Sequence, residues 1–185
     1  MHGNAAARQR SKRWVLLGVV VLITIAIVNG TMAFLDDGPP TEVEGVVYYE
    51  GLTSSIVDGP IAYDLQPPAG GPHAALIQEC GVYRVPVTDE NAVASLATGA
   101  VWIAYNPGID RSDIELLEDL ALGEREVILA PYPGLRAPVV VTSWGAQLVL
   151  DDPRDLRVPL FMTIYANSDR APDAAARCVG GIGPG

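Results

Sequence analysis

The longest apolar run in the chain lies close to its N-terminus. Residues 14–35, WVLLGVVVLITIAIVNGTMAFL, carry no charged side chain. A helix of this length would span about 33 Å, which is enough to cross a hydrocarbon core of about 30 Å. The pattern therefore predicts one transmembrane helix, an anchor, over residues 14–35.

The charges on either side of this run predict its orientation. Residues 1–13 contain four cations and no acid, whereas Asp36 and Asp37 follow the run directly. Flanking cations favour the cytoplasmic side of a membrane. We therefore expect a cytoplasmic basic head at 1–13, and we expect the rest of the chain to lie outside the cell membrane.

A cleaved signal peptide is the alternative interpretation of this segment. Its apolar stretch would end at Val28, and Thr31-Met32-Ala33 would provide the small-x-small cleavage site. The uncleaved anchor is favoured because the apolar run continues past Asn29-Gly30 for the width of a membrane. Under both interpretations the folded part of the chain is extracytoplasmic.

Beyond the apolar run, the pattern predicts a polar stalk at 36–45, one folded domain at 46–178 and a flexible tail at 179–185. Helical spacing of apolar residues predicts helices at 88–96, 110–122 and 155–166. Short apolar runs between turn residues predict strands at 46–49, 100–105, 126–130, 139–144 and 147–150. The irregular alternation of these elements favours an α+β fold, with two to three helices and a small mixed, mainly antiparallel sheet.

The charge of the chain excludes one class of partner. The net charge is -10, and because four of the 12 cations lie in the basic head, the remainder carries 8 cations against 22 acids, a net charge of -14. A domain this acidic does not bind the backbone of a nucleic acid. The expected partners are the membrane, through the single N-terminal span, and another membrane or cell-envelope protein.

Two cysteines, Cys80 and Cys178, agree with an extracytoplasmic domain. Neither belongs to a CxxC motif. In an oxidising compartment such a pair usually forms a structural disulfide. Two free thiols or a catalytic cysteine are the alternatives.

Little catalytic chemistry is visible in the sequence. His2 belongs to the basic head, which leaves His73 as the one histidine of the remaining chain, so a site with two or three histidines cannot form within one chain. No GxSxG motif is present. His73 is a candidate ligand-site residue or base, although a hydrogen bond that caps a loop is the more usual role. We predict no catalytic residue, no metal site and no cofactor.

Several short motifs occur in an ordered series between residues 67 and 181. They read PPAGGPH at 67–73, CGVY at 80–83, NAVASLATGAVW at 91–102, APY at 130–132, TSWG at 142–145 and CVGG at 178–181. In this series the chain resembles domain-of-unknown-function family 3105, over about residues 46–181. The resemblance implies an anchor of one N-terminal span and brings no assigned activity.

The chain departs from this family at one motif. Where the family pattern reads His-Ser-Leu-Glu-His-Gly, this chain reads Ala94-Ser95-Leu96-Ala97-Thr98-Gly99. On a helix, positions 94, 97 and 98 share one face, and the family's three polar side chains would suit a metal there. In this chain the ligands at Ala94, Ala97 and Thr98 are lost. The alternative is that the family's cluster only packs the helix.

These observations predict a single-pass, membrane-anchored extracytoplasmic domain that acts as a non-catalytic interaction or assembly module. The alternative is a metal- or small-ligand-binding domain, enzymatic activity included, that uses His73 with nearby carboxylates.

Overall fold

The computed structural model describes residues 24, 40–174 and 177–184. The chain divides into two units, Met1–Thr41 and Glu42–Gly185. The predicted transmembrane segment lies outside the described residues apart from Thr24, and no helix within the described part is long and apolar enough to cross a membrane. The second unit carries the fold and the candidate site.

In the described part of the second unit, six strands form one mixed sheet. The strands are β1 (Val47–Tyr48), β2 (Gly81–Val82), β3 (Val101–Tyr105), β4 (Val127–Pro131), β5 (Val139–Ser143) and β6 (Ala146–Leu150). Their order across the sheet is β1-β6-β5-β3-β4-β2. β4 runs parallel to β3 and β2, and the other neighbours are antiparallel. The predicted α+β class with a mixed sheet is confirmed.

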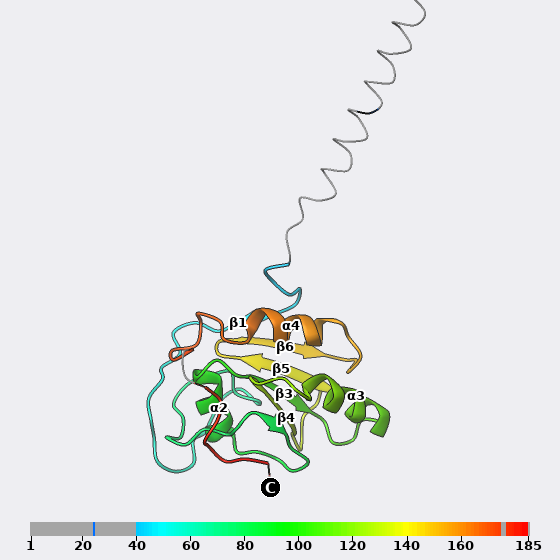
Figure 1. Ribbon diagram of the computed structural model, residues 1–185. Helices are drawn as coiled ribbons and strands as arrows, with labels where there is room; N and C mark the ends of the chain where they lie inside the picture. Colours follow the sequence, from blue (N-terminus) through cyan, green and yellow to red (C-terminus); the bar gives the residue numbers. More distant parts are fainter. Residues whose placement is uncertain (1–23, 25–39, 175–176, 185) are drawn as a thin grey trace, which may run out of the picture. The chain divides into compact units, whose positions relative to one another are not determined.

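Helices cover both faces of this sheet (Figure 1). The helices are α2 (Asp89–Ala97), α3 (Arg111–Ala121) and α4 (Arg157–Tyr165). Successive side chains of a strand point to opposite faces, so Ile103 joins the core beneath α3 and α4, whereas Trp102 joins the core beneath α2. Both side chains are fully buried. The all-apolar sequence of β3 therefore reflects burial on two sides.

Two elements depart most from the expected ones, the last helix and β2, whereas the boundaries of the other elements agree within one residue. The last helix begins at Arg157 instead of residue 155, because the Asp155 carboxylate accepts a hydrogen bond from the Arg157 backbone N–H at 2.9 Å. Pro159 then lies in the first turn, where its missing N–H breaks no helical hydrogen bond. β2 was not predicted, since a strand of two residues leaves no periodic pattern.

The folded domain extends further along the chain at both ends than the sequence predicts. Val43, assigned to the stalk, is buried in the core that also contains α4. Residues 179–184, assigned to a flexible tail, are hydrogen-bonded to the segment before β2. Ile182 forms a β-bridge with Gln78, and the Ile182 backbone N–H donates to the Ile77 carbonyl. The tail is therefore held by main-chain pairing as well as by Cys178.

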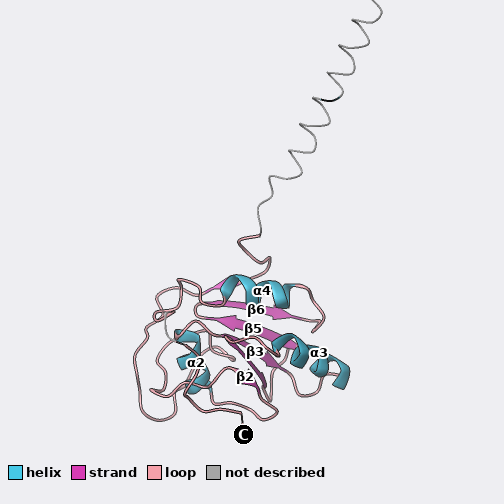
Figure 2. Cartoon of the chain, viewed as in Figure 1, coloured by secondary structure: helices cyan, strands magenta, loops and turns pink. Residues whose placement is uncertain are grey.

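Long loops gather around α2, away from α3 (Figure 2). Residues 49–80 connect β1 to β2. Among the described residues of this connection, one isolated β-bridge joins two of its own residues, Ile56 and His73. This connection contains the PPAGGPH motif. The candidate site is built mainly from it.

Candidate functional site

His73 is buried, with 8% of its surface exposed, and both of its ring nitrogens have partners. Nδ1 lies 2.9 Å from the Ala74 carbonyl oxygen, and Nε2 lies 3.1 Å from Ser54 Oγ. Because a carbonyl oxygen can only accept, Nδ1 donates this hydrogen bond, and in the tautomer protonated at Nδ1 the Nε2 atom accepts from the serine hydroxyl. The ring edge also contacts Trp144, with centroids 6.2 Å apart.

The Ser54–His73 pair has part of the geometry of a serine activated by a histidine base. Two features favour a structural role. Nδ1 is held by a main-chain carbonyl and not by a carboxylate, and the His73 backbone pairs with Ser55 and Val57 through two hydrogen bonds of 2.9 Å. The pair therefore fastens the segment around Ser54 to the end of the PPAGGPH motif.

The positions of the altered family motif lie on α2 and at its C-terminal end. Ala94 and Ala97 are buried, at 2% and 4% exposure, and the Thr98 hydroxyl donates to the Ser95 carbonyl at 2.8 Å. His73 lies near the start of this helix, because the next residue, Ala74, donates its N–H to the Glu90 carbonyl. Within the described residues, no group of three or more His, Cys, Asp or Glu side chains is placed to hold a metal ion.

A groove of about 540 Å³ opens between three loop segments, and we call it the loop groove. Its walls come from within residues 49–53, 61–65 and 68–72. The third segment belongs to the PPAGGPH motif. Most lining side chains are apolar or aromatic, and Asp64 is the one charged residue among the described residues that line it.

Close packing fixes the wall formed by the PPAGGPH motif. Gly70 has a φ of +139°, and a Cβ placed on it would lie 2.8 Å from Leu52 Cδ1 and 3.2 Å from the Trp144 ring. Only glycine fits this position without displacing its neighbours. On the other side, the Tyr63 hydroxyl donates to the Pro72 carbonyl at 2.7 Å, and burial together with the nearby Glu90 and Asp89 raises the pKa of Tyr63.

The first turn of α2 supports the second wall of the loop groove. The Glu90 carboxylate accepts from the Ile61 backbone N–H at 2.8 Å. Asp89 accepts a hydrogen bond from the Tyr132 hydroxyl at 3.1 Å, and burial raises the pKa of this carboxyl group. The two acids are thus engaged in holding loops, and their side chains are not free ligands directed into the groove.

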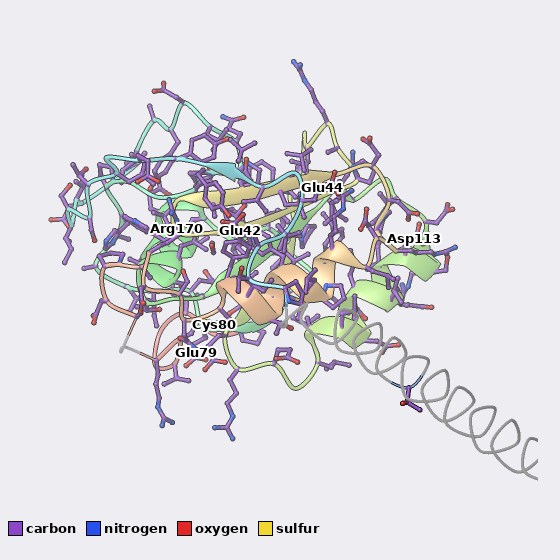
Figure 3. The ribbon with its side chains drawn as sticks, turned by 90° about the horizontal axis from the view of Figure 1, so that it is seen from above. Glu42, Glu44, Glu79, Cys80, Asp113 and Arg170 are labelled. Atoms are coloured by element: carbon purple, nitrogen blue, oxygen red, sulfur yellow. A yellow bond between two sulfur atoms is a disulfide. The ribbon has the colours of Figure 1, made fainter. Side chains whose placement is uncertain are left out.

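A smaller cleft of about 240 Å³ adjoins the loop groove and contains Arg170. The two spaces share Tyr49, Gly51 and Leu52 in their walls. Figure 3 labels Arg170, which comes from the C-terminal segment, and its guanidinium lies 4.8 Å from the centre of the Tyr48 ring in β1. No sequence motif marks Arg170, and the sequence reasoning missed both the groove and the cleft.

The predicted disulfide is confirmed: Cys80 and Cys178 are bonded, with their Cα atoms 5.4 Å apart. The bond closes a loop of 98 positions. In the chain-entropy model a loop of this length corresponds to about 4–5 kcal/mol of stabilisation as an upper value. The bond joins the C-terminal segment to the residue directly before β2, the strand on the edge of the sheet opposite β1.

Comparisons with known proteins give one result. A family model described as "Protein of unknown function (DUF3105)" matches residues 56–180, which is more than half of the chain. No curated protein and no solved structure matches. The matched range contains two of the three segments of the loop groove, 61–65 and 68–72, together with His73, both cysteines and Arg170.

Proposed function

Since the chain belongs to the DUF3105 family, we propose that it is a membrane-anchored, extracytoplasmic and non-catalytic binding module whose ligand occupies the loop groove. The loop groove itself carries the proposal. Sites for small ligands are typically concave and mostly apolar, with volumes of about 300–1,000 Å³. At about 540 Å³, the loop groove falls within this range.

The walls of the loop groove are fixed before any ligand arrives. Gly70 packs against Leu52 and Trp144, and the Tyr63 hydroxyl ties the second loop segment to the third. A site with fixed walls loses less conformational entropy on binding than one that must be ordered by its ligand. This rigidity supports a recognition role for loops that contain almost no regular secondary structure.

Two observations support the cellular placement. The uncharged residues 14–35 have the length and flanking charges of an anchor with its N-terminus in the cytoplasm. The Cys80–Cys178 disulfide is typical of an oxidising compartment. The partner would then be a ligand or an envelope protein met outside the cytoplasm.

A non-catalytic role is favoured over the metal-binding or enzymatic alternative. His73 uses both ring nitrogens for loop hydrogen bonds, and Glu90 and Asp89 bind a backbone N–H and a tyrosine. The positions at which the family pattern has two histidines and a glutamate hold two buried alanines and a threonine. No observation on the described residues favours a metal.

Blocking the loop groove tests the proposal. Ala62 is exposed and lines the groove, so Ala62→Trp should fill it without disturbing the core. Ala75 is also exposed and does not line the groove, so Ala75→Trp is the matched control. The full-length chain, purified in detergent, is incubated with a random tetrapeptide library and a small-molecule fragment library, and bound compounds are identified by mass spectrometry.

We expect compounds that bind the parent protein and Ala75→Trp but not Ala62→Trp. The proposal is contradicted if no compound binds the parent, or if the bound compounds are equally retained by Ala62→Trp. Thermal unfolding of both variants verifies that each is folded before the comparison is made.

A further inference from the structure

Arg170 lies at the border of the loop groove with its hydrogen-bonding capacity only partly used. Nη2 donates to the Glu50 carboxylate at 2.8 Å and to the Gly145 carbonyl at 3.2 Å. Nε is buried and has no hydrogen-bond partner. An unpaired buried donor costs free energy, so an acceptor that reached it would be bound favourably.

Two glycines line the cleft around Arg170, Gly145 at a close contact between main-chain segments and Gly51 beside open space. Gly145 has a φ of +68°, and a Cβ there would lie 2.9 Å from the Tyr49 carbonyl oxygen and 3.3 Å from Arg170 Nη2. A Cβ on Gly51, which borders both the cleft and the loop groove, would meet no atom within 4 Å. One ligand can therefore extend from the loop groove over Gly51 to Arg170.

Glu50 shows which chemistry this arginine accepts. Its carboxylate accepts a hydrogen bond from Arg170 Nη2, yet the Glu50 side chain is 80% exposed. Exposed ion pairs contribute about 0–1 kcal/mol, so a carboxylate from a ligand can replace this one at little cost. Among the described residues that line the groove and the cleft, Arg170 is the single cation, which suits a singly charged carboxylate better than a phosphate.

From this arrangement we infer that the ligand of the loop groove has an apolar body and one carboxylate, and that Arg170 binds the carboxylate in place of Glu50. The inference rests on the proposed function and adds the ligand's chemical class. The carboxylate can belong to the C-terminal end of a peptide or to a small organic acid.

Two matched pairs of probes test the inference on the full-length chain. The first pair is a random tetrapeptide library with free C-termini and the same library with amidated C-termini. The second pair is 3-phenylpropionate and 3-phenylpropanamide. We expect about tenfold stronger binding, or more, for the acid in at least one pair, because a hydrogen bond to a charged group is among the stronger ones. The pair that responds identifies the source of the carboxylate.

Variants then assign the effect to Arg170. Arg170→Gln should abolish the preference for the acid, whereas Arg136→Gln, which removes an exposed cation outside the groove, should preserve it. Glu50→Gln should strengthen binding of the acid by a few-fold, because it removes the competing carboxylate. This last variant alters only an exposed side chain and keeps the test valid if Arg170→Gln does not fold.

Equal binding of acid and amide in both pairs overturns the inference, and so does weaker acid binding by Glu50→Gln. If binding is lost in Ala62→Trp while acid and amide bind equally, the proposed function stands and the carboxylate assignment fails. If Ala62→Trp binds as the parent does, the proposed function itself fails.

Discussion

Single residues decide the shape of the loop groove, and Gly70 is the clearest of them. The sequence shows the PPAGGPH motif around it, but it does not show why a glycine is needed at this position. The residues that crowd it, Leu52 and Trp144, lie 18 and 74 positions away along the chain. The sequence therefore indicates an irregular turn, and only the fold reveals a packed wall.

Gly70→Ala should destabilise the protein more than Gly59→Ala. Both glycines have a positive φ, +139° and +91°, so both variants carry a conformational cost. Only at Gly70 would the added Cβ also meet neighbouring atoms, since none lies within 4 Å at Gly59. We expect an additional loss of about 1–3 kcal/mol in the free energy of unfolding, measured by chemical denaturation. Equal losses would show that the wall yields easily.

At the scale of elements, the sequence predicted the long and periodic ones. The helices at 88–96 and 110–122 and the apolar strand at 100–105 fall within one or two residues of α2, α3 and β3. Hydrophobic spacing suffices there because each element buries a continuous face. The parallel pairing of β3 with β4 and the two-residue β2 depend on contacts distant in sequence, which local periodicity does not encode.

The candidate site was predicted less well, for a physical reason. His73 was identified because histidine is rare in this chain, and the structure places it close to α2. The loop groove draws on three separated loop segments whose walls meet only after folding. Arg170 is one of several arginines, and its position beside Tyr48 has no local signature.

Restoring the family residue should be tolerated at Thr98, directly after helix α2, and should destabilise the protein at Ala97, within the helix. Ala97 is buried in an apolar cluster, so Ala97→Glu would bury an uncompensated charge. We expect this variant to lose about 3–5 kcal/mol in the free energy of unfolding. Thr98 is half-buried, and Thr98→His should cost about 1 kcal/mol, mainly the lost hydrogen bond to Ser95. Equal costs would mean that the Ala97 side of α2 has room for polar ligands.

At the scale of the whole molecule, one prediction concerns the cellular placement of the protein. The cations before residues 14–35 and the acids after them predict an uncleaved protein with its N-terminus in the cytoplasm. Cys80 and Cys178 should then form their disulfide outside the cytoplasm. N-terminal sequencing of protein taken from membranes, together with protease treatment of intact cells, measures this. A mature N-terminus at Phe34 would instead indicate cleavage and secretion.

The loop groove is the proposed recognition site of the molecule, and hydrogen–deuterium exchange tests this assignment most directly. The full-length chain is compared with and without the tetrapeptide that binds it most strongly. We predict slower exchange in residues 49–53, 61–65 and 68–72, with no change in α3 (Arg111–Ala121). Protection confined to other surfaces, or no protection while the peptide is bound, would contradict the assignment.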